Sequence, residues 1–186
     1  MLNDKPKKGS CFDGLLILSH DEAISLAQMT ESSDGILLYR ASRDGFRASA
    51  FHEKCDGKEN TLTIIKSNMD YVFGGYTSAK WSSNGGWTPD PTAFIFSLRR
   101  DGVSQSQKLS VTRAEYAIYG HDNHGPTFGG GHDFTLTDRS DIHFGSYSLL
   151  GNSYQRHSGN GEPIQFLAGN YNKWLTTEIE VYQIYK

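Results

Sequence analysis

Residues 61–77, TLTIIKSNMDYVFGGYT, give the strongest indication of the fold. β-Branched residues dominate Thr61–Ile65, the polar segment Ser67–Asp70 has the composition of a turn, and Tyr71–Thr77 is again apolar and aromatic. Two such runs joined by a short polar segment are typical of a β-hairpin. The pair Gly74-Gly75 inside the second strand predicts a bulge or a close approach of another part of the chain.

Further strands are expected on both sides of this hairpin. Before it, Ile36–Tyr39 is a short apolar run that predicts a buried strand. After it, the pattern predicts a strand at Ala93–Leu98 and shorter strands near residues 108–111, 116–119 and 133–137. The chain closes in an alternating strand, whose two faces carry Thr177, Ile179, Val181 and Tyr185 on one side and Glu178, Glu180 and Tyr182 on the other.

Two short helices accompany the strands. Ser19-His20-Asp21-Glu22 has the pattern of a capping box, which predicts a helix over about residues 20–29. The apolar residues of Phe46–Cys55 have helical spacing, and Asp56-Gly57 is suited to end that helix. Two polar segments rich in glycine, serine and asparagine, 82–92 and 138–170, predict loops, the second an elaborated surface loop.

Length and charge limit the classes of function. A chain of 186 residues suits one domain, with residues 1–13 as a flexible lead and 14–186 as the folded part. The net charge of −3 and a basic cluster confined to Lys5, Lys7 and Lys8 argue against nucleic-acid or anionic-membrane binding. No apolar run approaches the ~20 residues that a membrane span needs.

The sequence also predicts a cytoplasmic protein. The apolar run Leu15–Leu18 is too short for the core of a signal peptide, and the sequence has no Asn-x-Ser/Thr sequon. The two cysteines, Cys11 and Cys55, are therefore expected to be free thiols in a reducing compartment.

Three segments resemble chemical motifs but lack an essential part of each. The glycine-rich Gly125–Gly131 has no Gly-Lys-Ser/Thr ending, so it predicts a crowded backbone bend rather than a phosphate loop. His121–His124 and the following His132-Asp133 have no supporting cysteine and no preset ligand geometry, so no metal site is predicted. Cys55 lies at a helix end beside Asp56, which should raise its pKa, so a core thiol is favoured over a nucleophile.

Two tryptophans flank the loop at 82–92. Trp81 and Trp87 can either stack on a sugar or anchor a protein partner, or fold back over the core. The sequence leaves these alternatives open. A carbohydrate- or small-ligand-binding β-sandwich is therefore one candidate function. An uncharacterised enzyme is another, although no Gly-x-Ser-x-Gly elbow and no other catalytic set is visible.

Taken together and in order, five segments of the chain resemble the TLDc domain family. They are Leu37–Phe46, Thr61–Lys66, Val72–Tyr76, Phe94–Ser97 and Phe128–Gly131, and the closing Glu178–Tyr182 is similar to the family's last strand. The resemblance implies an α+β fold, a two-sheet antiparallel β-sandwich flanked by a few short helices. It also implies a role in oxidative-stress protection or in regulation of the vacuolar proton-ATPase, whose subunits would be the partners.

The chain departs from the family pattern at three places, one of which is the 138–170 loop. His132–Leu136 stands where the oxidation-resistance branch has an apolar Gly-Leu-Trp-Leu-Asp type of run, and Tyr182 replaces a final tryptophan. The resulting expectation is a non-enzymatic protein-interaction domain without a cofactor. Its predicted contact residues are Trp81, Trp87, His132, Asp133, Glu178 and Glu180. Because a lone buried carboxylate is unfavourable, at least one of the two glutamates should be exposed or paired.

Overall fold

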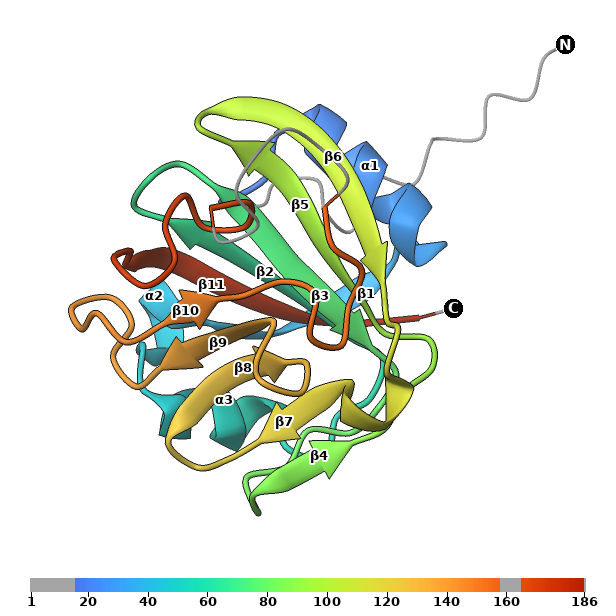
Figure 1. Ribbon diagram of the computed structural model, residues 1–186, viewed down its shortest axis with the longest axis vertical. Helices are drawn as coiled ribbons and strands as arrows, with labels where there is room; N and C mark the ends of the chain where they lie inside the picture. The colour runs from blue at the N-terminus through green and yellow to red at the C-terminus, as the bar shows by residue number, and fades with distance from the viewer. Residues whose placement is uncertain (1–15, 158–164, 186) are drawn as a thin grey trace, which may run out of the picture.

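The computed structural model describes residues 16–157 and 165–185, and it has two antiparallel β-sheets packed face to face (Figure 1). The six-stranded sheet has the order β1 (Gly35–Arg40), β11 (Thr176–Ile184), β2 (Thr61–Ser67), β3 (Val72–Thr77), β5 (Phe94–Arg100), β6 (Val103–Ser110). The five-stranded sheet has the order β10 (Tyr147–Ser148), β9 (Phe134–Thr137), β8 (His124–Phe128), β7 (Ile118–Gly120), β4 (Gly86–Thr88). The helices are α1 (His20–Thr30), α2 (Ala41–Asp44), α3 (Ala48–Cys55) and the 3-10 turn η1 (Ala114–Tyr116). The predicted fold class, a two-sheet sandwich with a few short helices, is confirmed.

The predicted hairpin forms between β2 and β3, in unbroken register from Thr61 opposite Thr77 to Lys66 opposite Val72. Its two central glycines are places of close approach. A Cβ on Gly74 would lie 1.9 Å from the carbonyl oxygen of Thr63, and one on Gly75 would lie 2.6 Å from the Phe128 ring of the facing sheet. Glycine is therefore required here to bring the strand pair and the two sheets together.

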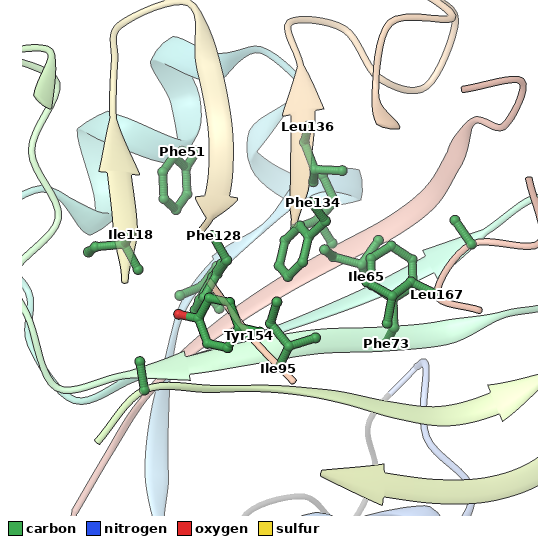
Figure 2. Packing of buried hydrophobic residues seen from close by; sticks show 14 of the residues in the cluster. Phe51, Ile65, Phe73, Ile95, Ile118, Phe128, Phe134, Leu136, Tyr154 and Leu167 are labelled. Atoms are coloured by element: carbon green, nitrogen blue, oxygen red, sulfur yellow. The ribbon is translucent and has the colours of Figure 1, made fainter. Parts of the chain in front are cut away.

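The main core fills the space between the two sheets (Figure 2). Phe73 of β3 and Ile95 of β5 face Phe128 of β8 and Phe134 of β9, and the last two rings stack with centroids 4.9 Å apart. α3 adds Phe51, whose ring also belongs to this cluster. Alternation along each strand thus places one apolar row of each sheet in a shared interior.

The other face of the six-stranded sheet is covered by α1, which buries Ala23 and Leu26 against this face. The predicted capping box is present, since the Ser19 hydroxyl accepts from the Glu22 backbone and the Glu22 carboxylate accepts from the Ser19 N–H. The same carboxylate lies 2.6 Å from the Arg99 guanidinium on β5. Glu22 therefore caps the helix, as predicted, and also links it to the sheet through Arg99, which the sequence pattern did not predict.

Four local predictions need correction. β1 is an edge strand in which only Tyr39 is buried, so the apolar run is not a fully buried strand. The predicted loop 82–92 contains β4, and the short strand expected near 108–111 is the eight-residue β6. The segment 138–170 is not simply a surface loop, because its apolar side chains complete the core, among them Leu150, Tyr154, Phe166 and Leu167. The predicted flexible lead, residues 1–13 with Cys11, lies outside the described residues.

Candidate functional site

A continuous group of aromatic and imidazole rings lies on the outer face of the five-stranded sheet. Ile118 of β7 points into the core, so the next residue, Tyr119, points outward. Tyr119 pairs directly with Trp87 of β4, and their ring centroids are 4.5 Å apart. We call this group the Trp87 patch; its members are Trp87, Tyr116, Tyr119, His121, His124, His132 and Tyr147.

Several elements contribute rings to the patch. η1 supplies Tyr116, which meets the Trp87 ring edge-on at 5.6 Å. The turn between β8 and β9 supplies His132, 5.6 Å from Trp87 and 5.3 Å from Tyr119. β10 supplies Tyr147, whose hydroxyl is hydrogen-bonded to His132 Nδ1 at 2.9 Å. Trp87 itself is 38% exposed, so the patch presents an aromatic surface to solvent.

A hollow of about 270 Å³ opens beside Trp87. It is lined by Trp87, Arg113, Tyr116, Gly130 and Gly131. The Arg113 guanidinium lies over the Tyr116 ring, 4.5 Å from its centroid, which is cation–π geometry. The hollow therefore combines two aromatic walls, one cation and a glycine backbone.

The histidines of the patch lie close to one another. The His124 ring is 5.2 Å from His121 and 5.8 Å from His132. Burial lowers the pKa of both His124 and His132, and the neighbouring imidazoles lower each pKa further. Since an ordinary histidine titrates near 6.5, these two rings are neutral at pH 7.

A fourth histidine supports the patch from α3. His52 Nε2 contacts the carbonyl oxygens of His121 and His124 at 2.8 and 2.9 Å, and Nδ1 contacts the Asp56 carboxylate at 2.7 Å. This bonding fixes the turn between β7 and β8. Within residues 16–157 and 165–185, no group of three or more His, Cys, Asp or Glu side chains is placed to hold a metal ion.

Residues 17–185 match the TLDc domain, which covers nearly the whole chain. The chain belongs to the TLDc domain family.

The segments that carry the TLDc resemblance serve mainly the interior. Four of the five segments lie wholly or partly in β1, β2, β3 and β5, which all belong to the six-stranded sheet. The fifth segment begins at Phe128, the last residue of β8. Family membership therefore accounts for the fold, whereas all seven rings of the Trp87 patch lie outside these segments. Among the described residues of this TLDc domain, no helix has the length and apolar character needed to cross a membrane.

The glycine-rich turn of the TLDc domain is a crowded bend, as predicted. Gly129 has φ +88°, and a Cβ there would lie 1.9 Å from the Asp133 carboxylate. That carboxylate is fully buried and accepts the backbone N–H groups of Gly151, Asn152 and Ser153 at 2.8–3.0 Å. Burial raises the pKa of Asp133 to about 6, although the three N–H donors oppose the rise. Asp133 thus anchors the following loop and is not on the surface.

Three more of the predicted contact residues, Trp81, Glu178 and Glu180, are also buried. Trp81 is 2% exposed and donates from Nε1 to Thr61 Oγ1 at 2.8 Å, so its core alternative holds. Glu180 is fully buried and lies 2.7 Å from the Arg40 guanidinium, while Glu178 accepts the N–H of Ser42. The expectation that at least one glutamate is paired is confirmed, but burial removes both from the surface that a partner can touch.

Of the six predicted residues, the structure brings Trp87 and His132 together on one surface. Sequence reasoning missed Tyr116, Tyr119 and Tyr147, since nothing in the local pattern gives their neighbours across the sheet. Cys55 is a free, buried thiol whose pKa is raised by burial and then by Asp56, which agrees with a core role.

Proposed function

We propose that this TLDc domain is a non-enzymatic protein-interaction module that binds its partner through the Trp87 patch. The observation that carries the proposal is the exposed Trp87 ring beside a hollow lined by Tyr116 and Arg113. Tryptophan, tyrosine and arginine are the residue types that dominate binding energy at protein interfaces. A preformed hollow beside exposed rings can take one large side chain of a partner.

The biological setting of the proposal comes from the family. Family membership supports a role in oxidative-stress protection, and the finer proposal is regulation of the vacuolar proton-ATPase from its cytoplasmic side. The domain would then act by occupying a site on an ATPase subunit and not by turning over a substrate. Glu178 and Glu180 have no direct part in this proposal, because both are buried in β11.

The test is affinity capture from the source cell with the tagged full chain. Trp87→Ala should reduce recovery of the specific partner by about tenfold or more, as truncating an interface hot spot does. Tyr185→Ala, which removes an exposed aromatic ring outside the patch, is the matched control and should bind like the wild type. Recovery of vacuolar ATPase subunits would support the finer role. Equal recovery by all three proteins would contradict the site.

The same rings also favour a second candidate, binding of a carbohydrate. Exposed Trp and Tyr faces stack on sugar rings, and Arg113 and His132 offer hydrogen-bond donors beside them. A glycan array combined with thermal-shift assays separates the two candidates. A glycan that raises the melting temperature of the wild type, but not of Trp87→Ala, would favour this second function.

A further inference from the structure

Four basic groups lie in or beside the Trp87 patch, and two described carboxylates form ion pairs with them; the basic groups are Arg113, His121, His124 and His132. Asp122 lies 2.9 Å from His121 Nδ1, and Glu115 lies 3.5 Å from Arg113 Nε, so each of these carboxylates already has a partner. The charge of Asp122 raises the pKa of His124, whereas His121 and His52 lower it. The His132 ring is a further neighbour of His124. Its Nδ1 is buried and has no hydrogen-bond partner.

His132 is surrounded by rings and not by carboxylates. Its neighbours are Trp87, Tyr119, Tyr147 and His124, and its hydrogen-bond partner is a phenol hydroxyl. The carboxylate next in the chain, Asp133, is occupied by backbone N–H groups of the 151–153 loop. His52, on the α3 side, already faces the carboxylate of Asp56.

The charge of the patch therefore changes with pH. At neutral pH His124 and His132 are uncharged, and Arg113 and His121 each face one carboxylate. As the pH falls, the imidazoles of His124 and His132, whose ring centroids lie 5.8 Å apart, can each gain a proton, and their like charges then repel each other. Among residues 16–157 and 165–185, Asp122 is the carboxylate that acts on His124, and none acts on His132. An external acidic group would therefore relieve the repulsion.

We infer that the Trp87 patch binds an acidic segment of a protein partner, and that its affinity rises as His124 and His132 take up protons. The inference rests on the proposed function, because it assigns partner chemistry and regulation to the same surface. One apolar side chain of the segment fills the hollow of about 270 Å³, and flanking carboxylates face Arg113 and the histidines. Proton uptake and peptide binding then strengthen each other reciprocally.

The test uses a defined probe, a fluorescent nine-residue peptide with one leucine between two runs of four glutamates. Its affinity for the full chain is measured by anisotropy at low salt, at about pH 7.5 and about pH 5.5. The wild type should bind about tenfold or more tightly at the lower pH, within the usual range of coupling between two sites. A peptide with glutamine in place of every glutamate should lose this pH dependence.

Variants connect the effect to the patch. The double variant His124→Gln/His132→Gln should keep less than about a threefold difference between the two pH values. Imidazole proton NMR of each protein reports the titration of the individual histidines and checks that the fold is intact. Equal affinity at both pH values, an unchanged pH dependence in the double variant, or no binding at either pH would overturn the inference.

Two further results separate this inference from the proposed function. If Trp87→Ala binds the acidic peptide like the wild type, the peptide binds elsewhere and the inference is wrong. If cellular capture still depends on Trp87 while peptide binding ignores pH, the proposed function stands and only the acidic, proton-linked partner is rejected.

Discussion

Replacing Arg40 by methionine tests how the edge strand β1 is fixed to the sheet. The Arg40 guanidinium is the counter-charge of the fully buried Glu180 carboxylate on β11, with Nη2–Oε1 2.7 Å and Nε–Oε1 2.8 Å. Removing one member of a buried ion pair destabilises by about 3–5 kcal/mol. Because the Arg40 side chain is 23% exposed, water can partly replace it, and we expect a loss of about 2–4 kcal/mol at pH 8.

The pH dependence of this loss identifies its cause. Burial raises the pKa of Glu180, and Arg40 opposes that rise. Without Arg40 the carboxyl should hold its proton at still higher pH in the folded state than in the unfolded state, so the folded state gains stability as the pH falls. The deficit of Arg40→Met should therefore be smaller at pH 5 than at pH 8.

Urea unfolding followed by tryptophan fluorescence measures both effects. Arg43→Met is the matched control, because Arg43 is 50% exposed and pairs with Asp44 at the surface. That exposed pair should contribute at most about 1 kcal/mol. A loss for Arg40→Met no larger than the loss for Arg43→Met, or a deficit that does not shrink at low pH, would refute the reasoning.

Three further predictions concern packing. Gly75→Ala forces a methyl group against an aromatic ring of the facing sheet and should lower stability by about 1–3 kcal/mol in thermal unfolding; an unchanged melting temperature would contradict the close approach. In a Cys11→Ser background, Cys55 should react with a chromogenic disulfide only as fast as the protein unfolds, because the thiol is buried and burial raises its pKa. Rapid labelling of the native protein would contradict the assignment of Cys55 to the core. Trp81→Ala should cost about 3–5 kcal/mol in urea unfolding, whereas Trp87→Ala should cost clearly less, and equal losses would mean that the core and surface assignments are wrong.

The sequence predicts the sandwich best where local pattern and tertiary role agree. The hairpin 61–77 is rich in β-branched residues and lies in the middle of the six-stranded sheet, and the capping box at Ser19 begins α1 as expected. β4 could not be predicted in this way. Its three residues, Gly86–Thr88, stand in a segment of loop composition and are too few to show a strand pattern, and they form a strand by pairing with β7.

Only part of the candidate site could be predicted, because strand pairing brings together residues that are far apart in the sequence. Trp87 stands out in the sequence as a large ring in a polar segment, but its neighbour Tyr119 is 32 positions away along the chain and meets it through strand register. The glutamates of β11 suggested a charged surface. They are buried because β11 lies between β1 and β2, where β1 supplies the Arg40 counter-charge.

The most direct test of the central claim is footprinting of the Trp87 patch in the captured complex. Hydroxyl-radical oxidation of aromatic side chains, quantified by mass spectrometry, is compared for the free chain and for the chain bound to its cellular partner. Trp87, Tyr116 and Tyr119 should become protected from oxidation, while the exposed rings of Phe144 and Tyr185 should not. Protection confined to Phe144 or Tyr185, with Trp87 oxidised equally in both samples, would contradict the Trp87 patch as the interaction surface.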